Sequence, residues 1–263
     1  MDIIIPVAVL GALGLLFGVG LAVAARTFCI ESDPRLDEVF NKLPGANCGA
    51  CGMPGCMGFA EGLIQGKCSV EGCAVTGEEE RKAIAGILGI SLSQKVRKIA
   101  ALHCNGGSLR AKDKHIYRGI EDCTAANLVM GGQKACIFGC LGLGTCVRVC
   151  PFGALTMSPE GLPVVDKDKC RACNKCVEAC PKKLFSLIPV SHTVYVACSS
   201  HDIGKDTRSV CSVGCIACKK CEQACPYEAI HVIDNLAVID YAKCTSCGEC
   251  VKVCPMKTIL VRG

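Results

Sequence analysis

CIACKKCEQACP at residues 215–226 and CTSCGECVKVCP at residues 244–255 are two copies of one cysteine run. Each copy reads C-x2-C-x2-C-x3-C-P. In a pair of such runs, three thiolates of one run cap a cubane 4Fe-4S cluster, and the cysteine before proline reaches across to the other cluster. The spacing therefore predicts one cluster on the first three cysteines of each run plus the last cysteine of the other. The two sets are Cys215, Cys218, Cys221 and Cys254, and Cys244, Cys247, Cys250 and Cys225.

Zinc is the alternative metal for paired cysteines. A zinc ribbon needs only two C-x2-C pairs, so zinc leaves the third cysteine, the three-residue step and the proline of both copies unexplained. The full pattern resembles bacterial-type ferredoxin and favours iron–sulfur clusters. A zinc-structured membrane scaffold stays as the hypothesis from outside redox chemistry.

The composition supports a metal carrier. The chain has 263 residues, 26 of them Cys, with no Trp and only 4% aromatic residues, which is too few large side chains for a conventional core. So many cysteines indicate either a secreted disulfide scaffold or a metalloprotein, and the run spacing favours the latter. Because thiolate ligands need a reducing compartment, the cysteine-rich body is predicted to be cytoplasmic.

The positive formal charge of +5 does not indicate nucleic-acid binding. Each 4Fe-4S cluster with four thiolates carries about −2 when oxidised, so six clusters contribute about −12. The loaded protein is then near −7, which is roughly the opposite of what a nucleic-acid partner requires.

Ile3 to Ala25 is a run of 23 residues without a charge. As a helix it rises about 35 Å, more than the roughly 30 Å of a bilayer's hydrocarbon core, which predicts a transmembrane helix. A signal peptide is the alternative, because Ala22-Val23-Ala24 resembles a cleavage site, but Asp2 stands where a basic region belongs. The basic residues Arg26, Arg35 and Lys42 follow the span, so the positive-inside rule predicts a single-pass protein of the cell membrane with its body in the cytoplasm. Cys29, just after the span, is predicted to be a thiol at the lipid interface rather than a ligand.

A second cysteine module follows the span. Cys48, Cys51 and Cys56 read C-x2-C-x4-C and can cap three corners of one cluster, while spacing alone leaves Cys68 and Cys73 equal as the fourth ligand. Three short helices are predicted around them: one that begins at Asp33-Pro34, one over Gly58 to Gln65, and one from a capping box at Thr76-Gly77-Glu78-Glu79 through Leu88.

The opening motif belongs to an internal repeat. One constant shift along the chain places Cys123, Cys136, Cys140, Cys146 and Cys150 on Cys198, Cys211, Cys215, Cys221 and Cys225, and a shift one position smaller places Cys170, Cys173, Cys176 and Cys180 on the last run. A strand over Lys95 to Leu102 is predicted ahead of the first copy. In that copy Leu143 stands where the second has Cys218, and Cys136 is the nearest substitute thiol, with Cys123 as its competitor. The predicted ligand sets are Cys136, Cys140, Cys146 and Cys180, and Cys170, Cys173, Cys176 and Cys150.

Four further cysteines precede the two copies of the repeat. They are the right number for a sixth cluster between the copies, beyond the five already assigned; the alternative is that they are buried thiols. They are Cys104, Cys123, Cys198 and Cys211. The sequence holds no catalytic constellation and no flavin or NAD fingerprint, so it predicts no catalytic pocket in this chain.

The order of these features resembles a known family. A single N-terminal span, then the stretch from Leu43 to Gly52 that reads Leu-Pro-Gly-Ala-Asn-Cys-Gly-Ala-Cys-Gly, then Gly139-Cys140-Leu141-Gly142-x-Gly144 and ferredoxin runs, is similar to the B subunit of the Rnf complex, in its longer clostridial-type form. The resemblance favours Cys73 over Cys68. It implies an electron-entry subunit that accepts electrons from reduced ferredoxin and passes them to membrane and NAD-binding subunits, which reduce NAD and move Na⁺ or H⁺. A polyferredoxin subunit of a hydrogenase or formate-oxidising complex is the alternative.

The predicted fold is α+β: an N-terminal transmembrane helix, a small helical 4Fe-4S module and two tandem dicluster ferredoxin-like modules. The predicted boundaries are residues 1–28 for the anchor, 29–90 for the helical module, 91–190 for the first dicluster module and 191–263 for the second.

Overall fold

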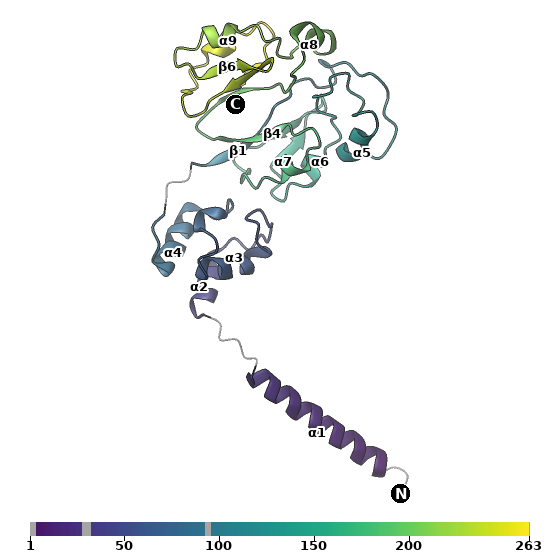
Figure 1. Cartoon of the computed structure of the whole chain (residues 1–263), viewed down its shortest axis with the longest axis vertical. Helices are drawn as coiled ribbons and strands as arrows, with labels where there is room; N and C mark the ends of the chain where they lie inside the picture. The colour runs from purple at the N-terminus through teal and green to yellow at the C-terminus, as the bar shows by residue number, and fades with distance from the viewer. Residues whose placement is uncertain (1–3, 28–32, 93–95, 263) are drawn as a thin grey trace.

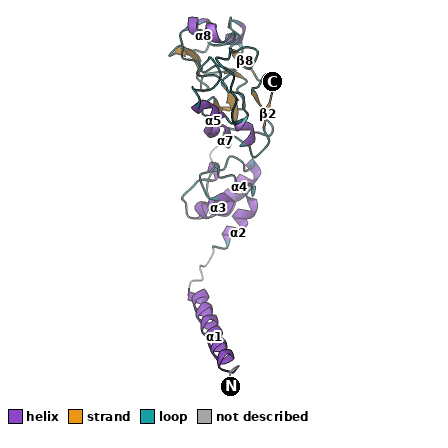
Figure 2. Ribbon diagram, turned by 90° about the vertical axis from the view of Figure 1, so that its right-hand side faces the viewer, coloured by secondary structure: helices purple, strands orange, loops and turns teal. Residues whose placement is uncertain are grey.

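The computed structural model describes residues 4–27, 33–92 and 96–262. The N-terminal helix α1 spans Ile4–Thr27 and lies apart from the other elements in both views (Figures 1 and 2). Its window from Val9 to Arg26 has a mean hydropathy of 2.0 and is not covered by the rest of the chain. The predicted apolar helix is therefore present, with the length and composition that crossing a membrane requires. Cys29 lies outside the described residues.

The helical part contains α2 (Arg35–Lys42), α3 (Gly55–Ile64), the 3-10 turn η1 (Val70–Gly72) and α4 (Glu78–Leu88). Asp33 stabilises the start of α2, because its Oδ1 accepts a hydrogen bond from the backbone N–H of Arg35 at 2.9 Å. α3 begins three residues earlier than the predicted Gly58. Val39, Phe59 and Ile84, one from each helix, are at most 1% exposed and form the centre of a small core.

The predicted capping box of α4 is wrong. No side chain caps the helix at Gly77, and the hydroxyl of Thr76 is buried without a hydrogen-bond partner. Arg81 instead reaches back, and its Nε and Nη2 donate to the carbonyl oxygen of Thr76 at 2.9 and 2.8 Å. The C-terminus follows the usual pattern, because α4 ends where Gly89 adopts the left-handed conformation, with φ of +67°.

The first ferredoxin-like module is built from two antiparallel strand pairs and short helices. β1 (Lys98–Leu102) pairs with β4 (Phe185–Pro189), and β2 (Leu155–Met157) pairs with β3 (Pro163–Val165). The helices are α5 (Cys123–Leu128), α6 (Thr145–Arg148) and α7 (Lys175–Ala179). The predicted strand at Lys95 to Leu102 is thus present from Lys98 on, and Lys95 lies outside the described residues.

The second module repeats this plan. β5 (Val194–Val196) pairs with β8 (Ile259–Val261), and β6 (Ile230–Ile233) pairs with β7 (Leu236–Ile239). α9 (Lys220–Gln223) and α10 (Glu249–Lys252) occupy the positions of α6 and α7, while α8 (Gly204–Val210) precedes them. Figure 1 shows this module next to the first, at the end of the molecule away from α1.

Each of the three parts has its own small buried cluster. Leu102, Leu184 and Phe185 lie in the first ferredoxin-like module, and Val194, Ile230 and Ile259 lie in the second. Cysteines contribute to all three clusters, beside few large side chains. Cores this small supply little stability, so bound clusters are the natural cross-links. The α+β class and the tandem ferredoxin-like modules agree with the sequence analysis, whereas the exact domain boundaries stay a prediction.

Candidate iron–sulfur centres

The second module surrounds two cavities with cysteines in the crossed arrangement. One cavity is lined by Cys215, Cys218, Cys221 and Cys254, and the other by Cys225, Cys244, Cys247 and Cys250. The last cysteine of each run therefore lies with the first three of the other, although it is distant from them in sequence. A short helix separates the last cysteine of each run from the first three. α9 lies before Cys225 and α10 lies before Cys254, so each of these cysteines reaches the cavity of the other run.

Left-handed residues shape the loops that hold the first three cysteines. Ala217 and Lys219 flank Cys218 with φ of +54° and +59°, and Ser246 and Gly248 flank Cys247 with +58° and +83°. Such residues turn backbone N–H groups toward one side of the loop, which is how a backbone builds a concave site for an anion.

The sulfur before each proline accepts a backbone hydrogen bond. The N–H groups of Ala229 and Thr258 donate to the Sγ atoms of Cys225 and Cys254, both at 3.4 Å. In the first module Ala154 and Leu184 donate to Cys150 and Cys180 at the same distance. N–H donors at cluster sulfurs favour the more negative, reduced state of a cluster.

One cavity of the first module matches the predicted ligand set. Cys150, Cys170, Cys173 and Cys176 line it together. The other cavity differs from the prediction, because it is lined by Cys123, Cys140, Cys146 and Cys180. Cys136, which the sequence analysis assigned to this set, is absent from its lining. Cys123 is thus the thiol that stands in for the missing counterpart of Cys218.

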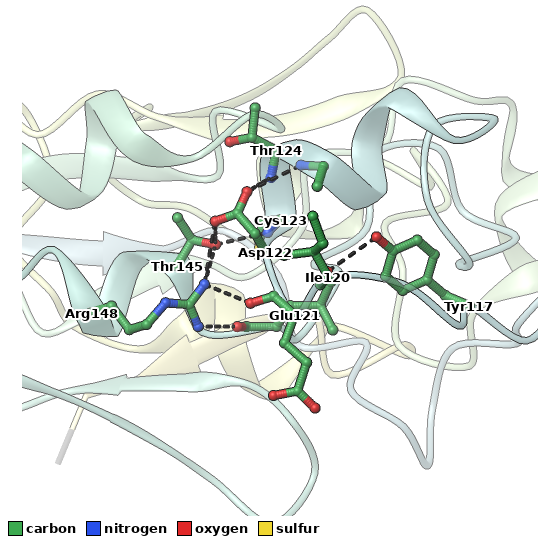
Figure 3. Close-up of polar contacts among 10 residues, drawn as sticks. Tyr117, Ile120, Glu121, Asp122, Cys123, Thr124, Thr145 and Arg148 are labelled. Atoms are coloured by element: carbon green, nitrogen blue, oxygen red, sulfur yellow. Dashed lines mark hydrogen bonds and ion pairs between the residues drawn. The ribbon is translucent and has the colours of Figure 1, made fainter.

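A polar network holds Cys123 at this cavity (Figure 3). Asp122 caps α5 by accepting hydrogen bonds from the N–H groups of Thr124 and Ala125 at 2.8 and 3.1 Å. Thr145, beside Cys146, donates its hydroxyl to Asp122 at 2.8 Å and accepts the N–H of Cys123 at 2.8 Å. The network therefore links Cys123 directly to the loop that carries Cys146.

Arg148 ties the same network to the position of the missing cysteine. Its Nη1 donates to the carbonyl oxygen of Leu143 at 2.9 Å, and its Nη2 donates to that of Glu121 at 2.7 Å. The guanidinium also lies 3.3 Å from the carboxylate of Asp122. Hydrogen bonds from backbone N–H groups and from Thr145 hold the pKa of Asp122 below its ordinary range, so the carboxylate stays charged at neutral pH.

The helical module presents one cavity, lined by Cys48, Cys51, Cys56 and Cys73. Asn47 supports its loop, since its Oδ1 accepts the N–H of Cys56 at 2.7 Å. Cys68 lines none of these five cavities. Its thiol lies 3.6 Å from the carbonyl oxygen of Phe59, to which it donates, so the structure leaves Cys73 as the fourth thiol at the cavity.

The cavity thiols are chemically suited to an iron–sulfur core. Burial raises the pKa of Cys146, Cys221 and Cys250 to about 11 and that of Cys176 to about 12, and negative charge on neighbouring cysteines adds to each shift. A thiolate in such a place needs a strong positive charge beside it, which iron supplies. Across the described residues, no three of the metal-binding side chains are close enough to share one metal ion; the thiols surround the cavities instead.

Besides Cys68, four of the described cysteines lie outside the five cavities, near the contacts that form the junction between the modules: Cys104, Cys136, Cys198 and Cys211. The predicted sixth set contained Cys123 rather than Cys136. In the structure Cys123 lines a cavity of the first module, and Cys136 lies outside it. The repeat alignment that placed Cys123 on Cys198 concealed this difference, because the first module carries an insertion that the repeat comparison did not reveal.

Comparison with known proteins gives the same picture of the modules. A family model described as a putative Fe-S cluster matches residues 43–75, and one described as a 4Fe-4S dicluster domain matches residues 135–184 and 214–258. The matched segments contain all four thiols of the helical module and the cysteine runs of both ferredoxin-like modules.

Similar proteins match along most of the chain. The B subunit of the Na(+)-translocating ferredoxin:NAD(+) oxidoreductase complex of Acetobacterium woodii is 47% identical over 242 residues, which are 92% of this chain and 73% of that protein. The B subunit of the ion-translocating oxidoreductase complex of Methanosarcina acetivorans is 45% identical over 97% of both chains. The B subunit of the proton-translocating ferredoxin:NAD(+) oxidoreductase complex of Clostridium ljungdahlii is 41% identical over 92% of this chain and 86% of that protein. This chain therefore belongs to the family of the B subunits of ion-translocating oxidoreductase complexes, the Rnf complexes.

Proposed function

We propose that this protein accepts electrons from reduced ferredoxin and relays them through its clusters to the other subunits of a membrane complex. Those subunits reduce NAD and couple the transfer to Na⁺ or H⁺ movement. The named relatives support the complex and its chemistry, since two of the three are B subunits of ferredoxin:NAD(+) oxidoreductases. The observation that carries the proposal is the convergence of four cysteines on each of five cavities in one chain.

Each cavity is proposed to hold one 4Fe-4S cluster on its four cysteines. The sets are Cys48, Cys51, Cys56 and Cys73; Cys123, Cys140, Cys146 and Cys180; Cys150, Cys170, Cys173 and Cys176; Cys215, Cys218, Cys221 and Cys254; and Cys225, Cys244, Cys247 and Cys250. Each cluster supplies a centre that takes up one electron and gives up one electron. The chain covers most of these thiols at least in part and directs N–H groups at the sulfurs, which adjusts the potential.

The second module is the proposed entry point for a soluble electron carrier. Of the cysteines that the structure describes, only Cys218 and Cys247 are exposed, and both belong to this module. Lys219 and Lys220, which follow Cys218 directly, are exposed as well. Positive charge beside an accessible cluster steers an acidic carrier such as a ferredoxin toward it.

The cysteine-rich body is proposed to face the cytoplasm, with α1 as its membrane anchor. Arg26, in the last turn of α1, supports this orientation, as do Arg35 and Lys42 in α2. Cytoplasmic placement also suits thiolate ligands, because that compartment is reducing.

Two measurements test the relay. Reduced ferredoxin added to the detergent-purified full-length protein should bleach the cluster absorbance, and deletion of residues 1–26 should release a soluble body with the same iron and acid-labile sulfide. Zinc without labile sulfide would refute the electron-transfer proposal. Loss of iron on truncation would refute the role of α1 as a simple tether. Copurifying subunits would separate this complex from a hydrogenase or formate-oxidising assembly.

A further inference from the structure

Cys104 and Cys198 occupy the same position in the two ferredoxin-like modules. Leu102 in β1 pairs with Phe185 in β4, and Val196 in β5 pairs with Ile259 in β8. Each cysteine lies two residues beyond the paired residue of its first strand. The hydrogen bonds that follow also correspond, since His103 N donates to Leu184 O at 2.7 Å and Ala197 N donates to Thr258 O at 2.8 Å.

The surroundings of the two sulfurs correspond as well. Cys140 N donates to Cys104 Sγ at 3.4 Å, and Cys215 N donates to Cys198 Sγ at 3.3 Å. A second N–H, from Gly106 or from Ser200, is also directed at the respective sulfur. The two thiols therefore share one local structure, including the donors that cluster sulfurs attract.

Cys136 and Cys211 form a second equivalent pair, because each lies four residues before the first cavity cysteine of its module, Cys140 or Cys215. The segment from Cys104 to Cys136 in the first module is more than twice as long as the segment from Cys198 to Cys211 in the second. The additional stretch contains Cys123, which has no equivalent in the second module. The junction thus receives two matched cysteines from each module.

The four sulfurs lie near one another. A methyl group placed on Gly106 would be 3.8 Å from Cys104 Sγ and 3.2 Å from Cys211 Sγ, so this glycine leaves room between the two thiols. Cys136 is close enough to Cys104 and Cys211 for charge on either of them to act on it. Cys198 is likewise close enough to Cys104 to feel its charge. Cys104 is therefore a neighbour of all three other thiols.

Contacts between the modules enclose the site. Ala111 and Cys211 form an isolated β-bridge, Lys112 N donates to Val210 O at 2.9 Å, and Ser212 N donates to Arg110 O at 2.9 Å. On the other side Ser199 Oγ donates to His103 O at 2.9 Å. The thiols are thus held by two surfaces that already pack together, which gives the site a defined geometry.

A buried positive charge lies at the same place. Lys134 is only 7% exposed, its ammonium lies 3.0 Å from the carboxylate of Asp113, and its charge acts on Cys104. A buried lysine beside a thiol lowers the cost of negative charge there. A 4Fe-4S cluster on four thiolates carries such a charge.

We propose that Cys104, Cys136, Cys198 and Cys211 hold a sixth 4Fe-4S cluster, with two equivalent ligands from each ferredoxin-like module. This proposal rests on the proposed function and deepens it, because the site lies between the two halves of the relay. Its sulfurs accept hydrogen bonds from Cys140 and Cys215, which belong to one cavity of each module. The cluster takes one electron from one module and gives one electron to the other, so it returns to its starting state.

Iron and acid-labile sulfide counts of the detergent-purified full-length protein test the site. The wild type should contain about 24 iron atoms per chain, and Cys211→Ser and Cys136→Ser should each contain about 20. The matched control is Cys68→Ser, because Cys68 lines none of the five cavities and should leave the count unchanged. A wild-type count of about 20, unchanged in Cys211→Ser, would refute the sixth cluster while leaving the five-cluster relay intact.

A double variant separates loss of one cluster from misfolding. Cys136→Ser combined with Cys211→Ser should also contain about 20 iron atoms, because both residues belong to one cluster. A fall to about 16 or below would overturn the shared site, since it would mean that each substitution damages a different cluster. Absence of labile sulfide in the wild type would instead refute the relay itself, so the two failures are distinguishable.

Discussion

The two ferredoxin-like modules share their strands, their short helices and their crossed cysteines, yet they complete one cavity in different ways. In the second module Cys218 supplies a thiol from within the regular run, and its side chain is exposed. In the first module Leu143 stands at that position, and Cys123 arrives from an insertion held by Asp122, Thr145 and Arg148. A cluster site thus requires four converging sulfurs, whereas the segment of chain that provides each of them can change.

This difference has a second consequence for the junction. Because Cys123 serves the first module's own cavity, Cys136 is left for the junction beside its equivalent, Cys211. In the proposed assignment, the first module thus replaces a ligand of its own cavity without removing one from the junction site. The cysteines of the second module are also the more accessible ones. Cys218 and Cys247 are exposed, whereas Cys123 and Cys173 in the first module are half-buried.

The largest expected effect on iron content comes from moving the fourth thiol of this cavity from Cys123 to the position of Leu143. Cys123→Ser should remove one whole cluster, about four iron atoms, because three protein thiols remain at its cavity. Adding Leu143→Cys should restore that iron. Gly142 and Gly144 flank Leu143 with φ of +74° and +72°, the left-handed backbone that also flanks Cys218. Iron analysis measures both steps, and full iron in Cys123→Ser would contradict the assignment.

The next largest effect is expected in the rate at which a soluble oxidant destroys the clusters of the two modules. A water-soluble oxidant such as ferricyanide is expected to destroy the clusters of the second module several times faster, because Cys218 and Cys247 are exposed. Cys221→Ser and Cys146→Ser are a matched pair at equivalent positions. The fast phase of absorbance loss should shrink in the first variant and persist in the second; the opposite result would reverse the comparison.

A smaller effect is expected from the network around Cys123. Asp122→Ala removes the acceptor for two N–H groups of α5 and for the hydroxyl of Thr145, so Cys123 is held less firmly. Iron loss to a chelator should become faster, and Asp122→Asn, which keeps an acceptor oxygen, should show a weaker effect. Asp168 is exposed in the same module, and Asp168→Ala serves as the control. Equal rates in all these variants would contradict the positioning role of Asp122.

The smallest effect concerns one backbone position that the modules fill differently. Gly142 and Ala217 are equivalent and both left-handed, but a methyl group on Gly142 would lie 2.9 Å from the carbonyl oxygen of Gly161. Gly142→Ala should destabilise the loaded first module by about 1–2 kcal/mol and lower its melting temperature by about 4–16 °C. Ala217→Gly should be nearly neutral, because relief of strain offsets the added chain entropy. Thermal loss of cluster absorbance measures both variants, and equal shifts would contradict the difference.

Much of the fold and of the candidate sites is readable from the sequence because it depends on local spacing. The runs at Cys215 and Cys244 predict crossed cavities, the uncharged stretch from Ile3 to Ala25 predicts a long apolar helix, and the structure contains both. The capping box at Thr76 failed for the opposite reason: Thr76 is buried with its hydroxyl unpaired, and the helix begins after Gly77 without a side-chain cap. Packing, which a motif does not report, decided this.

The sequence by itself determined the tandem ferredoxin-like plan and the thiols of the regular runs, because three cysteines at steps of three residues can meet only around one compact group. The tertiary structure alone decided between Cys123 and Cys136. A repeat comparison aligned Cys123 with Cys198, whereas strand pairing makes Cys104 the true equivalent of Cys198. The physical reason is that the insertion between Cys104 and Cys136 changes the shift between equivalent cysteines from 94 positions before it to 75 positions after it, and Cys123 inside it happens to lie 75 positions before Cys198. Only packing in three dimensions shows where that thiol ends.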